Sequence, residues 1–147
     1  MSPSRSPEIR RLRTGDRDLA RRLFAMMERV FEGEPGELGD AYLDDLLAHE
    51  AFRAFAALEG GDVVGGLTAH VLPMTRSESF ELFVFDVAVR EDRQRRGVGR
   101  LLMEAARRDA AGDVFVAADA DDSHALDFYR VLGGEEAPAV IFTFPND

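Results

Sequence analysis

The chain has 147 residues, 46% of them hydrophobic and 31% charged, which is the size and composition of one globular domain with its own core. Its formal net charge of −10 argues against nucleic-acid binding, which depends on neutralising phosphates, and favours cationic partners. Cysteine is absent, which excludes a disulfide framework, and no apolar run reaches the roughly 18 residues of a membrane span, so we expect a cytoplasmic protein with no membrane partner.

The first fifty residues predict a loose tail, a short strand and two helices. Residues 1–7 are expected to form the tail and residues 8–13 the strand, after which capping residues begin a helix over 14–30. A loop rich in glycine and acid, 32–39, separates it from a second short helix over 41–50. The apolar residues of the first helix recur at helical spacing, at Leu19, Leu23, Met26, Met27 and Val30.

The middle of the chain predicts three consecutive strands. Residues 52–58 and 63–72 read as strands, and the glycine-rich stretch 59–62 between them is a hairpin signal. Residues 80–89 form the most strongly apolar strand candidate, nearly continuous in β-favouring residues, which indicates a strand covered on both faces.

The last third alternates helix and strand. An apolar stripe beginning at Val98 predicts a helix that ends by Gly112, and residues 114–118 read as a buried strand. A further helix, capped by Asp121, Asp122 or Ser123, is expected to run to Leu132, and residues 140–144 to close the fold as a last strand. We therefore predict a single domain over 8–147, an α+β fold with a mixed sheet whose first half is mostly antiparallel.

The loop QRRGVG at 94–99 carries the clearest chemical signal. It stands between the apolar strand and a helix, in a segment 90–100 that holds five arginines against two acids. Amides of a first helical turn lack internal partners, glycine lets a bulky anion approach them, and arginine adds donors suited to phosphate. The segment therefore predicts a diphosphate cradle.

Three interpretations of this loop compete. A solvated basic loop with glycines for packing is the simplest, since short glycine motifs are weakly specific. A dinucleotide-binding fold would use Gly97 and Gly99 with Asp119 on the ribose, but Leu102 occupies the third glycine position and seven residues precede the first glycine. A P-loop is excluded because no Gly-Lys-Ser/Thr ending exists. The third interpretation is that the loop binds coenzyme A.

The coenzyme A interpretation is supported by a family resemblance over most of the chain, 9–144. Gln-x-x-Gly-x-Gly after a strand resembles the pyrophosphate motif of the GNAT N-acetyltransferases, and 125–134 resembles their later motif, with Gly134 where phenylalanine is common. Four blocks are particularly similar to the aminoglycoside 3-N-acetyltransferases of that superfamily: 41–58, 63–73, 85–89 and 117–122.

The resemblance implies an acetyl-CoA site between two parallel strands that splay apart, 80–89 and 114–119. The pantetheine arm would pair with the backbone of the first strand, and the diphosphate would lie on amides of the glycine loop. The implied cofactor-binding residues are Val87, Ala88, Val89, Gln94, Arg95, Arg96, Gly97, Val98, Gly99 and Arg100. Arg95 and Arg96 facing solvent or the adenosine 3′-phosphate are alternatives that the sequence leaves open.

Two residues are candidates for catalysis. Asp86 is the one charged residue between Leu82 and Val89, and it is expected to accept or relay a proton from the acceptor ammonium, or to orient the amine. Its alternative role is to satisfy a backbone donor, and a β-bulge would change which side chains share its face. Tyr129 matches the usual family acid for the coenzyme A thiolate, although its spacing also fits a helical core stripe.

The acceptor is expected to be cationic. Asp119, Asp121 and Asp122 follow a strand, where ligands meet such sheets, and are candidate substrate-binding residues, although Asp122 also fits a helix cap. Further acids extend this surface or form an ordinary solvated charge run: Glu32, Glu34, Glu37, Asp40, Asp44 and Asp45. The three histidines show no metal-ligand spacing, so no metal is expected.

The resemblance thus implies an enzyme that moves acetyl from acetyl-CoA to an amino group, the 3-amino group, of an aminoglycoside antibiotic, and a possible homodimer. Two alternatives remain at this point. One is a GNAT acetyltransferase for another amine, such as a polyamine, a small metabolite or a protein N-terminus. The other is a non-catalytic module that binds coenzyme A.

Overall fold

The computed structural model describes residues 6–146, so most of the predicted tail lies outside the described residues. The chain divides into two compact units at Ala117 and Ala118. Within the described range the first unit contains a five-stranded sheet, and the second contains one helix. Among these residues no helix is long and apolar enough to cross a membrane.

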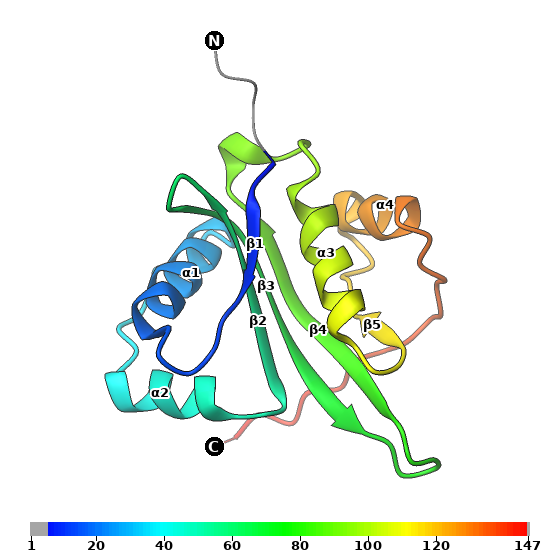
Figure 1. Cartoon of the computed structure of the whole chain (residues 1–147). Helices are drawn as coiled ribbons and strands as arrows, with labels where there is room; N and C mark the ends of the chain where they lie inside the picture. The colour runs from blue at the N-terminus through cyan, green and yellow to red at the C-terminus, as the bar shows by residue number, and fades with distance from the viewer. Residues whose placement is uncertain (1–5, 147) are drawn as a thin grey trace. The chain divides into compact units, whose positions relative to one another are not determined.

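The sheet of the first unit has the order β1-β2-β3-β4-β5, antiparallel through β4 and parallel between β4 and β5 (Figure 1). The predicted α+β class with a mixed sheet is confirmed, and most element bounds agree within two residues. The elements are β1 (Glu8–Arg11), α1 (Arg17–Val30), α2 (Asp40–Ala48), β2 (Phe52–Glu59), β3 (Asp62–Pro73), β4 (Phe80–Val89), the 3₁₀ turn η1 (Glu91–Arg93), α3 (Val98–Asp109) and β5 (Val114–Val116).

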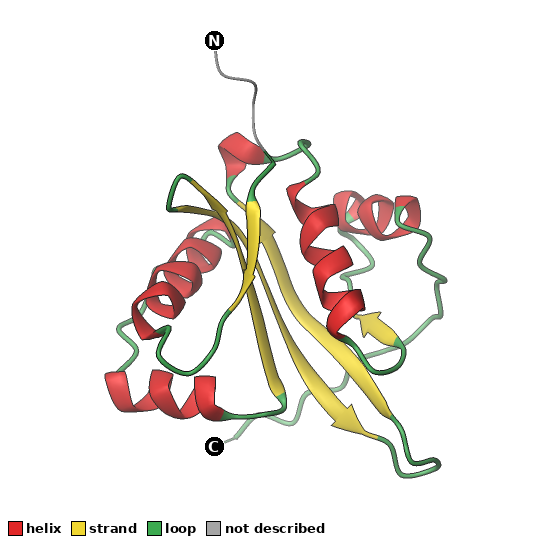
Figure 2. Ribbon diagram, in the orientation of Figure 1, coloured by secondary structure: helices red, strands yellow, loops and turns green. Residues whose placement is uncertain are grey.

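Two adjacent glycines of β3 bring helices close to opposite faces of the sheet. A Cβ at Gly66 would lie 2.2 Å from the Leu23 side chain of α1, and one at Gly65 would lie 2.8 Å from the Val98 side chain of α3. Helices α1 and α3 accordingly flank the sheet ribbon in Figure 2. Because either glycine would clash with a helix if it carried a side chain, this pair fixes how closely both helices pack. Leu23, Val64, Leu67, Val84 and Leu102 are fully buried between these layers.

Along β4 some side chains are buried and others are exposed, so the prediction that both faces of this strand are covered is wrong. Leu82 and Val84 are buried, whereas Phe85 is 54% exposed. The pairing of β4 with β3 shifts at this point, and Phe85 is the extra residue of a β-bulge. After the bulge Ala88 belongs to the apolar cluster beneath α1. The bulge therefore reverses which positions of β4 face α1.

The second unit contains α4 (Ser123–Val131), and its predicted cap is confirmed. The Asp122 carboxylate accepts a hydrogen bond from the Ala125 amide at 3.1 Å, and Gly133, with φ of +90°, follows the helix end.

The strand predicted over residues 140–144 is wrong, because this described segment pairs with no other strand. Its apolar side chains, including Val140 and Phe144, are more than three-quarters exposed. An apolar period predicts a strand only where a partner completes its backbone hydrogen bonds. As a result β5 is an edge strand of the described sheet, and it ends at Val116 rather than at residue 118.

Candidate functional site

β4 loses its parallel neighbour halfway along its length. The ladder with β5 covers three pairs and ends at Val84 and Val116. The bulge residue Phe85 comes next, and from there to Val89 no described strand lies on that edge of β4. Peptide groups of an open strand edge can pair with an extended ligand, as in β-strand addition. Val87 and Ala88 lie in this open stretch.

Gln94 anchors the basic loop to the end of β4. Its side-chain amide donates to the Val89 carbonyl at 3.0 Å, and the Arg90 amide donates to the Val64 carbonyl at 2.8 Å. Two residues implied as cofactor contacts, Gln94 and Val89, therefore bind each other. This contact holds the loop at the point where the strand edge ends.

The five arginines of segment 90–100 separate into two groups. Arg90 pairs with Asp92 at 2.6 Å, and Arg93 pairs with both Glu59 and Asp92 at 3.0 and 2.9 Å. The hydrogen bond from Arg90 lowers the pKa of the Asp92 carboxyl. The other three arginines are exposed and form no ion pair with any described residue. The arginines available to an anion are Arg95, Arg96 and Arg100.

The N-terminus of α3 is built without a side-chain cap. Gly97 occupies the cap position with φ of +83°, two residues after Arg95, which also adopts a left-handed φ of +64°. The Gly97 carbonyl accepts the Leu101 amide at 3.0 Å, so the amides of the intervening first turn have no helical acceptor. A guanidinium nitrogen of Arg100 lies 3.6 Å from the position that a Cβ of Gly97 would occupy. Bare amides and a guanidinium thus meet at one point, an arrangement suited to phosphate oxygens.

Val98 and Gly99 contribute backbone rather than side chains to this cradle. Both are buried, and the Val98 side chain packs toward Gly65 of β3. The ten implied cofactor contacts therefore differ in what they offer a ligand. Those on the open edge of β4 and in the first turn of α3 offer main-chain groups, and the three exposed arginines offer charge.

Asp86 lies beside the open edge, on the α1 face of the sheet. It pairs with Thr68, two residues from the α1-facing Gly66, whereas Val84 pairs with Ala69 on the opposite face. The bulge thus turns Asp86 away from the face that carries Leu82 and Val84. Asp86 accepts no hydrogen bond from the described residues 6–146.

The carboxyl of Asp86 has a perturbed pKa although its side chain is exposed. Partial desolvation by its surroundings raises this pKa, and the negative charge of Glu28 on α1 raises it further. A carboxylate with a raised pKa and no partner, next to an open strand edge, is a candidate proton acceptor.

A sequence profile of the Acetyltransferase (GNAT) family matches residues 19–133, which is more than half of the chain. The chain belongs to the GNAT acetyltransferase family. No curated protein sequence matches it significantly.

Solved structures agree with this membership. The aminoglycoside acetyltransferase meta-AAC0020 from an uncultured soil metagenomic sample, solved with sisomicin, is 34% identical, with a TM-score of 0.90 over 95% of this chain and 96% of that one. The aminoglycoside acetyltransferase HMB0005, also from an uncultured soil metagenomic sample, is 29% identical, with a TM-score of 0.91 over 97% and 100%. AAC(6′)-Iy, solved with CoA, is 21% identical with a TM-score of 0.78 over 100% of both chains, and shares the fold.

The remaining candidate residues of this GNAT protein belong to its second unit. The Asp119 carboxylate accepts the Asp121 amide at 2.9 Å, and Asp122 caps α4, so both acids hold local backbone. Tyr129 is half-buried on α4, with its ring centroid 5.0 Å from that of Phe128. The ligand contacts of the three aspartates and the catalytic role of Tyr129 stay predictions.

A row of aromatic side chains lies on the sheet face that also carries Asp86, and the sequence did not predict it. From β2 to β5 the ring centroids of five residues follow one another at 5.6, 6.2, 6.1 and 4.8 Å: Phe52, His70, Phe85, Phe83 and Phe115. His70 and Phe83 are register partners, as are Phe83 and Phe115. Register is not visible in a single sequence, so the sequence alone does not predict this row.

Several acids of the predicted acidic surface are already paired. Arg17 donates to both carboxylate oxygens of Asp44 at 2.9 and 2.6 Å, and Arg21 pairs with Asp40. The hydrogen bond from Arg17 lowers the pKa of the Asp44 carboxyl. Asp40 and Asp44 therefore hold α2 against α1. Over the described residues no group of acids and histidines is arranged to hold a metal ion.

Proposed function

We propose that this GNAT protein transfers an acetyl group from acetyl-CoA to an amino group of an aminoglycoside, and that the 3-amino group is the acceptor. One observation carries the proposal: a basic segment that includes the exposed Arg95, Arg96 and Arg100 joins the open edge of β4 to the uncapped first turn of α3. The 34% identity to an enzyme solved with sisomicin supports the acceptor class. The 3-amino position rests on the family resemblance.

The chain offers acetyl-CoA two kinds of contact. The diphosphate would lie on the amides of Val98 to Arg100, with guanidinium groups of Arg95, Arg96 and Arg100 adding charge-assisted hydrogen bonds. The amide-containing arm would run along Val87 and Ala88 as an added strand. When bound, acetyl-CoA supplies an activated acetyl thioester. Because the rest of the molecule is acidic, this basic segment is the part suited to an anionic cosubstrate.

Asp86 would act on the acceptor. An ammonium group must lose a proton before its nitrogen can attack a carbonyl carbon, and the Asp86 carboxylate would take that proton directly or through water. Its raised pKa increases its affinity for the proton. Tyr129 would return a proton to the departing thiolate, a role carried over from the family motif.

The test is incubation of the purified protein with acetyl-CoA and sisomicin, kanamycin or spermidine, followed by thiol release and mass spectrometry. We expect thiol release with the aminoglycosides and a mass gain of one acetyl group, located on the 3-amino nitrogen by fragmentation. Acetylated spermidine with unmodified aminoglycosides would support the alternative amine acceptor instead. Tight acetyl-CoA binding without any acetylated product would support a non-catalytic module.

A further inference from the structure

The basic segment that leads into α3 is not held by apolar packing. None of residues 90–97 is buried, and their one regular element is the 3₁₀ turn η1. Arg95 adopts a left-handed φ of +64°, a conformation that is unfavourable for a residue with a side chain. A loop of this kind keeps one conformation where specific polar contacts hold it. Those contacts therefore decide how the segment meets a ligand.

Three contacts tie this segment to the sheet. Backbone carbonyls of β3 and β4 accept hydrogen bonds from two of its residues, Arg90 and Gln94. The third contact joins two side chains, because Nε of Arg93 lies 3.2 and 3.0 Å from the two carboxylate oxygens of Glu59, the last residue of β2. Among residues 6–146 it is the one ion pair between this segment and another element.

Arg93 connects Glu59 to the rest of the segment. Nη1 of Arg93 donates to the Asp92 carboxylate at 2.9 Å, and the same carboxylate accepts hydrogen bonds from Arg90 at 2.6 and 3.1 Å. The Arg93 and Glu59 side chains are 28% and 31% exposed, so water and salt screen this pair less than a fully exposed one. Removal of Glu59 would therefore open one end of a chain of four charged side chains.

The β2–β3 hairpin fixes the position of Glu59. The two central residues of its turn, Gly60 and Gly61, both have positive φ, +56° and +89°, as tight turns that match the twist of the strands require. Glu59 and Asp62 flank the turn as register partners. The carboxylate of Glu59 therefore projects from a two-residue turn, which has little freedom to move.

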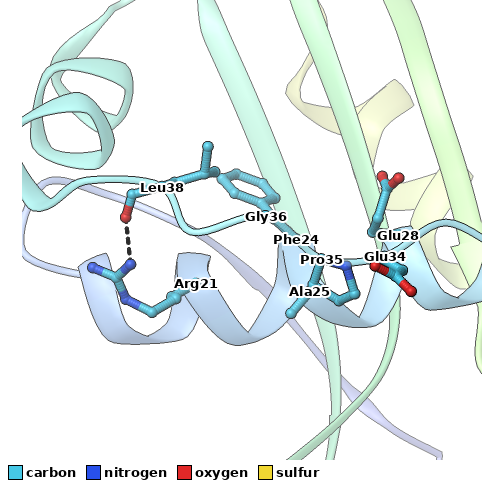
Figure 3. A pocket seen from close by; sticks show the side chains of 8 residues that line it. All are labelled: Arg21, Phe24, Ala25, Glu28, Glu34, Pro35, Gly36 and Leu38. Carbon is cyan, nitrogen blue, oxygen red and sulfur yellow. Dashed lines mark hydrogen bonds between the residues drawn. The ribbon is translucent and has the colours of Figure 1, made fainter.

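Helix α1 anchors this hairpin at its backbone. Arg22 of α1 donates to the Gly61 carbonyl at 2.9 Å. The preceding residue, Arg21, donates in the same way to the Leu38 carbonyl in the loop after α1 (Figure 3). Adjacent arginines of one helix thus hold a backbone carbonyl in each of two loops. The turn that carries Glu59 is consequently tied to the body of the first unit.

We propose that Glu59 is a positioning residue for the acetyl-CoA site, which holds Arg93 so that the basic segment presents the uncapped first turn of α3 to the diphosphate. This role deepens the proposed function, on which it rests, and it belongs to a residue that touches no substrate. Charge and position predict opposite effects at Glu59. An acid near an anion site opposes binding by its charge, so its loss would strengthen acetyl-CoA binding if charge alone acted. Positioning predicts weaker binding.

The test is calorimetric titration of the full chain with acetyl-CoA. Glu59→Gln keeps the length of the side chain and removes the charge that holds Arg93, so we expect the affinity to fall about fivefold. In thiol-release assays at saturating sisomicin the KM for acetyl-CoA should rise with kcat nearly unchanged. Tm should stay within about 4 °C of the wild-type value, because the pair is partly exposed. A merely structural role would lower Tm and leave KM unchanged.

Asp62→Asn is the matched control. Asp62 is exposed and forms no ion pair with any residue between 6 and 146, although it flanks the same turn as Glu59. Its charge reaches the segment, since the pKa of Arg90 is raised by the hydrogen bond to Asp92 and further by the charges of Asp62 and Glu59. Asp62→Asn thus removes a similar charge without removing a contact, and it should not weaken acetyl-CoA binding.

A double-mutant cycle separates the contact from the charge of Arg93. Arg93→Gln alone should weaken acetyl-CoA binding, and Glu59→Gln should have little further effect in that background. Equal or tighter acetyl-CoA binding by Glu59→Gln, or additive losses in the cycle, would overturn the positioning role while leaving aminoglycoside acetylation intact. A wild-type protein that binds no acetyl-CoA would overturn the proposed function itself, and the role of Glu59 with it.

Discussion

The orientation of Asp86 depends on one extra residue in β4. In a regular strand Asp86 would share the face of Val84, which is fully buried, and an unpaired carboxylate there would be costly. The bulge at Phe85 turns it to the opposite face, beside Thr68 and near Glu28. The sequence identified Asp86 because it is the one charge in an apolar strand. It did not reveal the face, because a bulge leaves no mark in a period-two pattern.

Replacing Asp86 with asparagine should lower the activity of the protein and raise its stability. We expect kcat/KM to fall by about 100-fold, the scale of one general base, with acetyl-CoA affinity unchanged. The folded-state pKa is raised above the unfolded value, so ionised Asp86 disfavours the fold at neutral pH, and Asp86→Asn should raise Tm at pH 7. This gain should vanish as pH falls below the unfolded pKa of about 4, where both states are protonated. Thermal melts at pH 7 and pH 3.5 measure it. A lower Tm at pH 7 would contradict this account.

The same carboxyl should set the acidic limb of activity. A raised pKa moves that limb of the kcat/KM profile above the ordinary aspartate value of about 3.9. Partial desolvation is the larger cause of the raised pKa and the charge of Glu28 the smaller, so Glu28→Gln should shift the limb to lower pH without restoring the ordinary value. The profile is measured by thiol release at saturating acetyl-CoA. An unchanged limb in Glu28→Gln would show that Glu28 does not act on the catalytic group.

Gly97 tests the cradle with a pair of variants. Gly97→Ala should destabilise the fold by about 1–2 kcal/mol, the cost of a left-handed backbone at a residue with a side chain. Its Cβ adds no clash, because the nearest atom is 3.6 Å away. Gly97→Glu adds bulk and a negative charge beside the bare amides. We expect Gly97→Glu to weaken acetyl-CoA binding at least tenfold more than Gly97→Ala, measured by calorimetry. Equal losses in the two variants would leave the cradle without support.

At the scale of elements, one carboxylate ties the end of α3 to the sheet. Asp109, the last residue of α3, pairs with Arg11 of β1 at 3.0 Å and Arg53 of β2 at 2.9 Å. Burial and the neighbouring charge of Arg53 lower the pKa of Arg11. Two partly buried cations therefore share a single acid, and removing it would leave them facing each other.

Asp109→Asn should consequently destabilise the fold. We expect a loss of about 2 kcal/mol in the free energy of unfolding, less than for a fully buried pair because all three side chains keep some exposure. Urea unfolding followed by circular dichroism measures the loss. Asp127→Asn, which removes an exposed partner of Arg130 on α4, is the control and should cost under about 1 kcal/mol.

The elements that the sequence predicted well are those whose signal is local. The buried stripe of α1 and the apolar run of β4 gave bounds close to those observed, because side-chain period alone defines them. Residues 140–144 have an equally apolar pattern but no strand partner in the described chain. Pairing partners, register and the Asp109 contacts join residues far apart in sequence, so a single sequence does not contain them.

At the scale of the whole molecule, the charge acts in opposite senses on the two substrates. A net charge of −10 attracts a cationic acceptor, and the carboxylates of Asp86 and the neighbouring Glu28 would attract it further. For acetyl-CoA the local attraction of Arg95, Arg96 and Arg100 opposes the repulsion of the acidic remainder. Added salt weakens both this attraction and this repulsion, so its two effects on acetyl-CoA binding partly cancel.

The two Michaelis constants should therefore respond unequally to ionic strength. Between about 0.01 M and 0.5 M salt, where the Debye length falls from about 30 Å to a few ångströms, the KM for sisomicin should rise steeply and the KM for acetyl-CoA much less. Initial rates of thiol release with one substrate saturating give each constant in turn. In Glu28→Gln the salt dependence for sisomicin should be shallower, since one of the screened attractions has been removed. A steeper response of acetyl-CoA than of sisomicin would contradict this division, because it would mean that local arginines, and not the acidic surface, dominate the long-range field.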